Sequence, residues 1–204
     1  MINLASDYYN FNLEKTFVIP NGVSITNSKT QKKFDFTKGM EIVFFNGLDS
    51  SRRRGLKELI NVLCNQRGIH LSVIGNHLTT DFKNIRFYNP MKEDVLQEFL
   101  NEKHVFIDNL FYMPFSTLAL QAMALGMILI VSDSSGISSY IKKGKNGFVY
   151  NSQKPEEIGK ILDQISNSMY QPEFISKNAI ETIKSFRWEL VALKYFNAYK
   201  KILK

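Results

Sequence analysis

The segment Phe111–Gly136, FYMPFSTLALQAMALGMILIVSDSSG, is the part of this chain that best predicts its fold. Its pattern indicates a loop, a helix over Ser116–Leu125, a buried strand over Met127–Ser132, and a second polar loop. Gly126 follows the helix at the position where a left-handed residue commonly ends one. In α/β proteins such loops meet at the carboxyl ends of the strands and form a ligand cleft. We therefore expect part of a binding site here.

Strand-like and helical patterns alternate on both sides of this segment. Short segments that are almost entirely apolar indicate strands covered on both faces, and segments with apolar residues at helical spacing separate them. The expected strands are Thr16–Ile19, Glu41–Phe45, His70–Ile74, Ile85–Tyr88, His104–Ile107, Met127–Ser132 and Gly147–Tyr150. The expected helices are Gly55–Gln66, Lys92–Asn101, Ser116–Leu125, Pro155–Ser166, Pro172–Ser185 and Trp188–Ile202.

This alternation predicts parallel βαβ units in a single sheet. Pro155 and Pro172 suit the first turns of their helices, and the polar segment Ser24–Gly39 suggests an exposed loop. A chain of 204 residues is most economically one domain with a sizeable core. The predicted fold is α/β, a doubly wound, mainly parallel Rossmann-like sheet with helices on both faces and a helical C-terminal tail.

The composition, with 44% apolar and 22% charged residues, is typical of a soluble globular protein. The first residues, MINLASDYYN, hold no signal-peptide pattern, and no apolar run is long enough to span a bilayer, so we expect a cytoplasmic protein. Cys64 is the only cysteine, which excludes an intramolecular disulfide. The net charge of +7 fits either an anionic partner or a generally basic soluble protein.

The three histidines give no indication of a metal site or a catalytic centre. His70, His77 and His104 are scattered without metal-ligand spacing, and no HExxH motif accompanies them. The chain also lacks a GxSxG elbow, a Walker loop and a GxGxxG fingerprint. We therefore expect neither a metal nor an organic cofactor.

Consecutive arginines, Arg52, Arg53 and Arg54, stand at the start of the helix expected from Gly55. The positive end of the helix dipole disfavours cations there. A bound anion would explain them, because guanidinium groups and free backbone N–H groups both bind phosphate. A solvated charge run at a loop tip is the alternative. Gly47, at the end of the preceding strand, would let a ligand approach the backbone.

Polar residues around the helix of the opening segment are further candidates. The segment Pro114–Thr117 precedes or begins the helix, so its free backbone N–H groups could hold an anion. Alternatively, Ser116 or Thr117 could be a plain helix cap. Gln121 is the only strongly polar side chain in STLALQAMAL, and it either hydrogen-bonds a ligand hydroxyl or faces solvent. The strand ends Leu71–Asn76 and Phe87–Met91 would lie at the same edge of the sheet.

Taken in order, these segments resemble the C-terminal, donor-binding domain of retaining GT-B glycosyltransferases of family 4 (glycosyltransferase group 1). Val18–Val23 is similar to the family's IPNGVD signature, and Gln121–Gly126, QAMALG, resembles EAMAxG. Ser185–Lys201 resembles its closing FSWExVAxxYxxxYKK helix. Further resemblances lie at Asn46–Gly55, Ser72–Gly75, Phe87–Met91 and Lys143–Tyr150. The resemblance implies that this chain forms one half of a GT-B fold.

The resemblance also implies a nucleotide-diphosphate sugar, such as a UDP- or GDP-sugar, as donor and no metal. The residues implied at the donor phosphates are Gly47, Arg53, Arg54, Phe115, Ser116, Thr117 and Leu118. Those implied at the nucleoside are Gly75, Asn89, Met91 and Gln121. The sugar would lie at the position of Met113.

Three positions depart from the family pattern. The family's paired glutamates fall on Met113 and Gln121, and a thioether is a poor hydrogen-bond acceptor for a sugar hydroxyl. Gly47 stands where an arginine is usual. Either donor recognition has been rebuilt in this chain, or the chain is a non-catalytic member.

The expected organisation is a linker over residues 1–15 from a missing N-terminal domain, followed by a nucleotide-sugar-binding Rossmann-like domain over residues 16–204. The predicted function is sugar transfer to a glycan, lipid-linked or protein acceptor in surface polysaccharide, lipopolysaccharide or protein glycosylation. The domain alone should be inactive and should need an N-terminal acceptor domain or a partner subunit. The alternative is a non-catalytic subunit that binds or scaffolds a partner.

The basic charge also fits a peripheral contact with the inner face of the membrane. A nucleic-acid partner is a third interpretation of that charge, with a steep salt dependence as its signature. No recognition motif accompanies the charge, so we expect no nucleic-acid binding.

Overall fold

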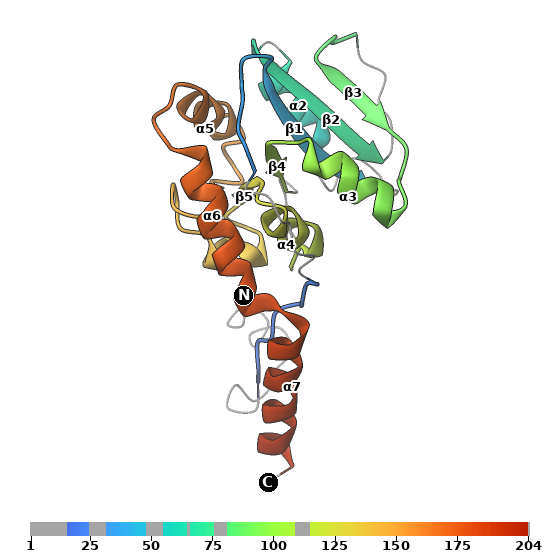
Figure 1. The fold of residues 1–204 in the computed structure, drawn as a ribbon, viewed down its shortest axis with the longest axis vertical. Helices are drawn as coiled ribbons and strands as arrows, with labels where there is room; N and C mark the ends of the chain where they lie inside the picture. The colour runs from blue at the N-terminus through green and yellow to red at the C-terminus, as the bar shows by residue number, and fades with distance from the viewer. Residues whose placement is uncertain are drawn as a thin grey trace.

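The computed structural model describes residues 16–24, 32–47, 55–64, 66–75, 81–108 and 115–203. Within these ranges six parallel strands form one sheet in the order β3-β2-β1-β4-β5-β6, with helices on both faces (Figure 1). This arrangement confirms the doubly wound α/β fold and the helical C-terminal tail. The strands are β1 (Met40–Gly47), β2 (Ile69–Gly75), β3 (Ile85–Tyr88), β4 (Val105–Ile107), β5 (Ile128–Ser132) and β6 (Phe148–Tyr150). The helices are α2 (Leu56–Leu63), α3 (Glu93–Asn101), α4 (Thr117–Ala124), α5 (Glu157–Ser166), α6 (Pro172–Ile183) and α7 (Trp188–Ile202), with 3-10 helices η3 (Gly136–Tyr140) and η4 (Lys184–Phe186).

The sheet separates two apolar cores because successive side chains of a strand point to opposite faces. On one face, Ile42 and Phe44 of β1 pack in a cluster with residues of α2 and α5. On the other face, Val43 packs in a cluster with residues of α3, α4 and α6. Burial on both faces explains why β4 and β5 are apolar at almost every position. The helices cover the two faces of the sheet but not the edge formed by the carboxyl ends of its strands, where ligands bind in α/β proteins.

The segment Thr16–Ile19 was expected to be a strand, and this prediction is wrong. It is irregular, and the first β-bridge of this part of the chain joins Val23 to Arg187. The Val23 amide donates to the Phe186 carbonyl oxygen at 2.9 Å. The segment therefore runs beside η4 and α7, and it pairs with none of the strands that the structure describes. An apolar pattern indicates burial, but a strand also needs a hydrogen-bonding partner.

Two further predictions need correction. Pro155 was expected in the first turn of its helix, but α5 begins at Glu157. Pro155 lies instead in a turn in which its carbonyl oxygen accepts a hydrogen bond from the Ile158 amide. The described part of the expected loop Ser24–Gly39 is not simply exposed, because Phe34 and Phe36 pack against the core and the His104 ring.

Other local predictions are confirmed. Gly126 follows α4 with φ of 72°, the left-handed conformation expected after a helix end. Pro172 occupies the first turn of α6. The helix predicted over Trp188–Ile202 is α7 with the same bounds. Of the helices that the structure describes, none is long and apolar enough to cross a membrane.

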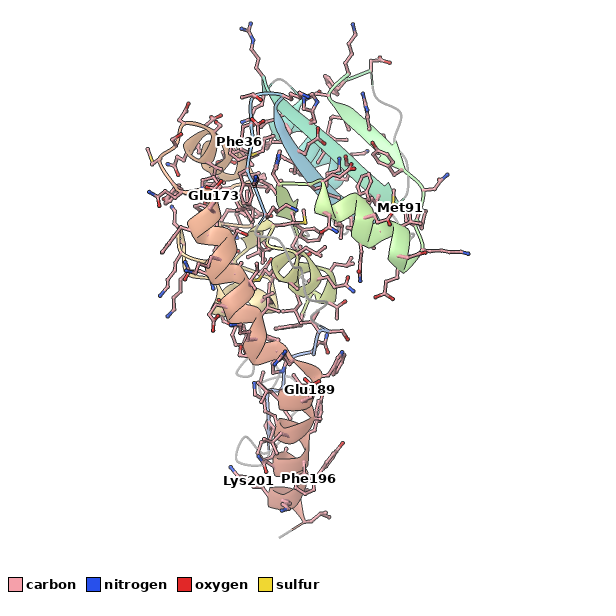
Figure 2. The ribbon with its side chains drawn as sticks, in the orientation of Figure 1. Phe36, Met91, Glu173, Glu189, Phe196 and Lys201 are labelled. Carbon is pink, nitrogen blue, oxygen red and sulfur yellow. The ribbon has the colours of Figure 1, made fainter. Side chains whose placement is uncertain are left out.

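The last helix, α7, extends away from the sheet (Figure 1). Within it only Val191 and Ala198 are buried. Figure 2 shows Phe196 and Lys201 projecting from opposite sides of this helix. Large apolar side chains of α7 are exposed: Trp188, Leu190, Leu193, Tyr195, Phe196, Tyr199 and Ile202.

Candidate functional site

The strand order of the sheet reverses between β1 and β4. In open α/β sheets, ligands bind at the carboxyl ends of the strands near such a reversal. Gly47 ends β1 and pairs with Gly75, the last residue of β2, after a register shift. Gly75 has φ of 121°, a conformation that side chains rarely adopt. Two adjacent strand ends without side chains leave the backbone open to a ligand.

Buried polar residues follow the central strands at this edge. Asn46 lies near the end of β1, Asp108 directly follows β4, and Ser132 ends β5, all of them buried. The Ser135 hydroxyl donates to Asp108 Oδ2 at 3.4 Å. Burial and the charge of Asp108 raise the pKa of Tyr150, which keeps its phenol neutral at physiological pH. Polar groups are concentrated at this end of an otherwise apolar core.

The N-terminus of α4 lies beside these strand ends and combines a helix cap with open backbone amides. Ser116 is buried, and its hydroxyl accepts a hydrogen bond from the Ala119 amide at 3.1 Å. Ser116 is therefore the helix cap, one of the two interpretations that the sequence left open. The amides of Thr117 and Leu118 precede the first intrahelical bond, so the helix itself supplies no acceptor for them. Amides in this position can bind an anion.

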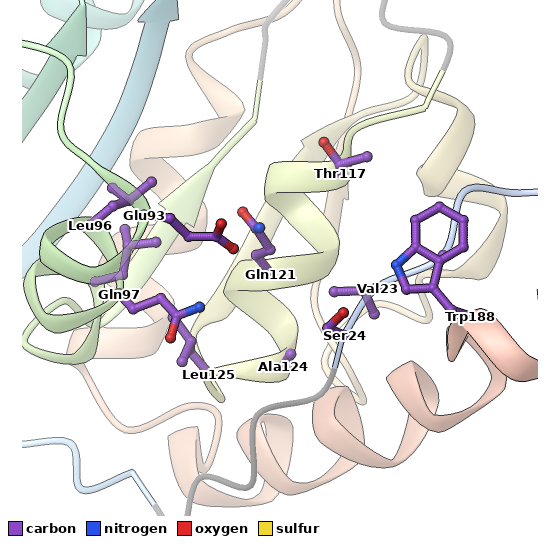
Figure 3. Close-up of a pocket in the computed structure, with 12 residues that line it drawn as sticks. Val23, Ser24, Glu93, Leu96, Gln97, Thr117, Gln121, Ala124, Leu125 and Trp188 are labelled. Carbon is purple, nitrogen blue, oxygen red and sulfur yellow. The ribbon is translucent and has the colours of Figure 1, made fainter.

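A cavity of about 280 Å³ lies between α3 and α4. Figure 3 shows the Gln121 amide directed from α4 toward Glu93 of α3, with Trp188 on the other side of α4. Gln121 is half-buried and lines the cavity rather than facing open solvent. The lining residues are Gly22, Val23, Ser24, Glu93, Leu96, Gln97, Leu100, Thr117, Gln121, Ala124, Leu125 and Trp188.

Of the candidate residues that the structure describes, the cavity brings together Thr117 and Gln121. Met91 is half-buried and packs on the core cluster under α3 and α4, whereas Asn89 is exposed. The Phe115 ring packs against Tyr140 and Phe186, at centroid distances of 6.2 and 6.0 Å, so its side chain is structural. Gly47, Gly75, Ser116 and Leu118 do not line the cavity. Arg53, Arg54, Met113 and the expected linker 1–15 lie outside the described residues.

Sequence reasoning missed several residues of this region. Asp108 could have been found as the polar residue that directly follows an apolar strand. Glu93 and Gln97 lie four residues apart and therefore share a face of α3. Trp188 is far from α4 in sequence, and no local signal places it at the cavity. In the part of the chain that the structure describes, no three His, Cys, Asp or Glu side chains group closely enough to hold a metal ion.

The Trp188 indole also fixes the segment that enters the domain. A Cβ atom at Gly22 would lie 2.4 Å from Trp188 Cδ2, so only a glycine fits against the ring as it is placed. The glycine of the IPNGV segment and the tryptophan of the last helix are thus in direct contact. This contact closes one wall of the cavity.

Comparison with known proteins agrees with this geometry. The family described as glycosyl transferases group 1 matches residues 31–182. The uncharacterized glycosyltransferase MJ1607 of Methanocaldococcus jannaschii is 25% identical over 146 residues, which are 71% of this chain and 34% of that protein.

Two solved structures illustrate the shared fold. The apo lipopolysaccharide outer core galactosyltransferase WaaB has a TM-score of 0.79 and 20% identity, over 98% of this chain and 59% of its own. Anabaena Alr3699/HepE in complex with UDP has a TM-score of 0.76 and 17% identity, over 98% of this chain and 60% of its own. The chain thus spans about 34% of the curated relative and 59% to 60% of these structures. The chain belongs to the glycosyl transferases group 1 family, and its sheet corresponds to the C-terminal domain of the GT-B fold.

Proposed function

We propose that this chain is the donor-binding half of a glycosyltransferase that transfers a sugar from a UDP- or GDP-sugar to a glycan, lipid-linked or protein acceptor. The observation that carries the proposal is the open N-terminus of α4 beside a cavity lined by Thr117 and Gln121. Anabaena Alr3699/HepE, which shares the fold, has been solved with UDP and with UDP-glucose. These structures support a nucleotide-sugar ligand for this chain.

In this proposal the diphosphate lies at the N-terminus of α4. The helix dipole and the amides of Thr117 and Leu118 stabilise the negative charge that grows as the diphosphate leaves. The paired glycines Gly47 and Gly75 let the phosphates approach the strand ends. The backbone N–H groups supply only partial positive charge to the proposed site. Arg53 or Arg54 would add a full positive charge. This arrangement requires no metal.

The nucleoside would occupy the cavity between α3 and α4. Gln121 can donate and accept hydrogen bonds to ribose hydroxyls. The family's second glutamate is absent, but Glu93 brings a carboxylate to the same cavity from the facing helix. We infer that Glu93 accepts a ribose hydrogen bond in its place. Asn89 and Met91 would border the base, and the transferred sugar would lie near Met113.

Sugar transfer by this half would require a second domain or a partner subunit to hold the acceptor. The exposed apolar side chains of α7 support this requirement. Trp188, Tyr195, Tyr199 and Ile202 follow one another at spacings of seven, four and three residues, which places them on one side of the helix. That side is suited to packing against another domain, and we expect no transfer by this chain alone.

The setting that fits this proposal is the cytoplasm, at the inner face of the membrane, where lipid-linked acceptors are glycosylated. A role in polysaccharide or lipopolysaccharide synthesis is supported by the fold shared with WaaB, a lipopolysaccharide galactosyltransferase. The net charge of +7 favours contact with an anionic membrane surface.

A non-catalytic, scaffolding subunit is the second candidate function. Met113 and Gln121 favour it, because they replace two carboxylates that the family uses. A scaffold would keep the apolar side of α7 for a partner but would lose nucleotide binding.

Isothermal titration of the chain with UDP, GDP and ADP separates the two candidates. We expect micromolar binding of one nucleotide, weakened about tenfold in Gln121→Ala because a hydrogen bond to the ligand is lost in a desolvated site. Gln164→Ala is the matched control, since Gln164 is also half-buried but lies on α5. The double change Arg53→Ala with Arg54→Ala should abolish binding. Absence of binding at millimolar concentrations of every nucleotide would exclude the donor-binding function.

A further inference from the structure

A second concavity, of about 800 Å³, lies over the amino-terminal part of the sheet. We call it the amino-end pocket. It lies over β1, β2 and β3, beside the end of α3. Ser72 is three residues before Gly75 on β2, which corresponds to about 10 Å along a strand. The pocket shares no lining residue with the cavity between α3 and α4. Its lining residues are Lys38, Glu41, His70, Leu71, Ser72, Lys83, Asn84, Arg86, Tyr88, Phe99, Glu102 and Lys103.

The sheet under this pocket is polar on one face only. Ser72 pairs with Arg86 in register, and Glu41 pairs with His70, so these side chains share the α3 face. On the opposite face the neighbouring residues are apolar and buried in the core: Ile42, Leu71 and Ile85. A sheet face covered by a helix is normally apolar. The polar side chains of this face line the pocket instead of an apolar core.

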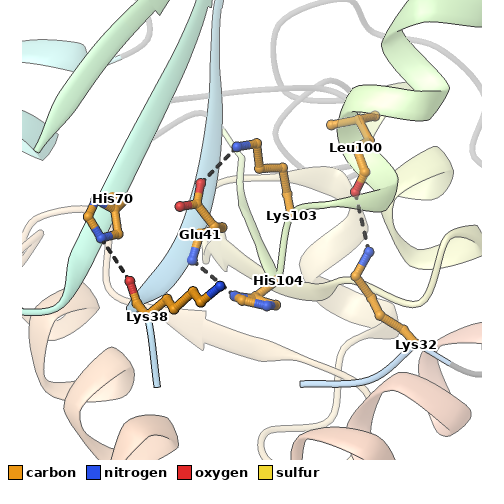
Figure 4. A network of polar contacts seen from close by, with 7 residues as sticks. All are labelled: Lys32, Lys38, Glu41, His70, Leu100, Lys103 and His104. Carbon is orange, nitrogen blue, oxygen red and sulfur yellow. Dashed lines mark hydrogen bonds and ion pairs between the residues drawn. The ribbon is translucent and has the colours of Figure 1, made fainter. Parts of the chain in front are cut away.

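The charges in the amino-end pocket leave an excess of cations. Lys103 is buried and its Nζ contacts Glu41 Oε2 at 2.8 Å, so these two charges compensate each other (Figure 4). Lys38, Lys83 and Arg86 form no ion pair within the described part of the chain. Apart from Glu41, the acidic residue that lines the pocket is Glu102, which is exposed and offsets one of these three positive charges. The remaining charge of about +2 matches a phosphate monoester, which carries roughly −1.5 to −2 at neutral pH.

A nearly buried hydroxyl marks the floor of the pocket. Ser72 is 3% exposed and lines the pocket. The hydroxyl lines the pocket next to Arg86, where it can donate to a ligand oxygen.

Two aromatic rings form another wall. Tyr88 of β3 and Phe99 of α3 meet edge to face at a centroid distance of 4.8 Å. Both rings are half-buried and line the pocket. The volume is within the range of pockets that hold small organic ligands. The pocket thus offers cations and a hydroxyl for an anionic group, and rings for an organic group.

We propose that the amino-end pocket binds a phosphate monoester, with Arg86, Lys83 and Ser72 on the phosphate and the organic part against Tyr88 and Phe99. The guanidinium of Arg86 contacts two phosphate oxygens, and the Ser72 hydroxyl donates to one of them. The ester is either a free metabolite or the headgroup of a lipid, because both present the same group. The site is independent of the donor nucleotide.

The test uses the full 204-residue chain, labelled with ¹⁵N, and two probes, inorganic phosphate and phenyl phosphate. We expect saturable shifts at the amides of Ser72 and Arg86, with tighter binding of phenyl phosphate because its ring contacts the aromatic wall. The shifts should persist when UDP is present at saturating concentration. Shifts confined to Thr117 and Leu118, or no saturable shift at all, would overturn the proposal.

Variants separate a built site from diffuse charge. Arg86→Gln should weaken phenyl phosphate binding about tenfold, as expected for a lost charge-assisted hydrogen bond. Ser72→Ala should weaken it about threefold if its hydroxyl donates to the phosphate. Arg67→Gln is the matched control, because Arg67 is exposed and carries the same charge but does not line the pocket. Equal weakening in Arg67→Gln would refute a specific site.

Vesicles distinguish the two sources of the ester. The chain is mixed with phosphatidylcholine vesicles that either contain phosphatidic acid or lack it. Binding to phosphatidic acid that is lost in Arg86→Gln identifies a lipid headgroup. Binding of phenyl phosphate without Arg86-dependent vesicle binding identifies a free metabolite. Either result supports phosphate monoester binding in the amino-end pocket. An absence of UDP binding alone would contradict only the proposed donor site.

Discussion

The contact between Gly22 and Trp188 allows a direct test of how the entering segment is fixed to α7. A methyl group at Gly22 would lie 2.4 Å from both Cδ2 and Cε3 of the Trp188 indole, which is far inside contact distance. Trp188 is 51% exposed, so its ring can turn toward solvent and relieve the clash. We therefore expect Gly22→Ala to lower the free energy of unfolding by about 1 kcal/mol, the lower end of the range for overpacking.

The assay benefits from Trp188 being the only tryptophan of the chain. Its fluorescence therefore reports on the surroundings of this ring without signal from another tryptophan, and the emission of Gly22→Ala should move to longer wavelength as the ring enters water. Urea unfolding followed by circular dichroism gives the free energy. Gly159→Ala is the comparison, because its Cβ would clash only with the end of the flexible Gln66 side chain and would lie at ordinary contact distance from Val62. That change lies within α5 and should be neutral or stabilising, since alanine favours a helix.

A double-mutant cycle completes the test. In a Trp188→Leu background the ring is absent, so Gly22→Ala should cost little, and the difference measures the coupling of the two residues. Unchanged emission together with unchanged stability in Gly22→Ala would refute the packing argument. The same loss of stability in both backgrounds would also refute it.

Three further predictions concern the cap, the buried histidine and the cavity. Ser116→Ala should lower the free energy of unfolding by about 1 kcal/mol in urea titrations because α4 loses its cap, and an unchanged value would contradict that role. Burial lowers the pKa of His104, whose Nδ1 accepts from the Glu41 amide at 3.0 Å, so the folded state favours the neutral ring. The contribution of His104 to the free energy of unfolding should therefore be fully present above the unfolded pKa of about 6.5. It should decrease as the pH falls from there toward the pKa of the folded state. The urea midpoint of His104→Asn should lack this dependence, and an equal slope in the variant would assign it to another group. Glu93→Gln should weaken UDP binding severalfold in calorimetry, whereas Glu98→Gln, on the same helix but outside the cavity, should not.

Much of the fold could be predicted because its local patterns and its tertiary contacts agree. All six strands of the described sheet were expected close to their observed positions, since strands covered on both faces are apolar at almost every residue. Gly126 and Pro172 were interpreted correctly because helix ends depend on backbone conformation near a single residue. Thr16–Ile19 has the same apolar pattern but lies beside η4 and α7, away from the strands that the structure describes.

The candidate site was only partly predictable. Gln121 is polar in an apolar helix, and that local contrast was sufficient to select it. Whether it faced solvent or a cavity depended on α3, which is about twenty residues away in the chain. Asp108, Glu93 and Trp188 were missed because nothing in their own neighbourhoods indicates what lies opposite them.

The sequence by itself determined the α/β class, the parallel sheet, the bounds of several helices and the resemblance to group 1 glycosyltransferases. These properties follow from the periodicity of burial and from residues that fix the backbone locally. Only the tertiary structure decided that Gly47 pairs with Gly75, that Gly22 packs on Trp188, and that Ser72 opens into a charged pocket. These contacts join residues far apart in the chain, and a side chain's function depends on which partners the fold brings to it.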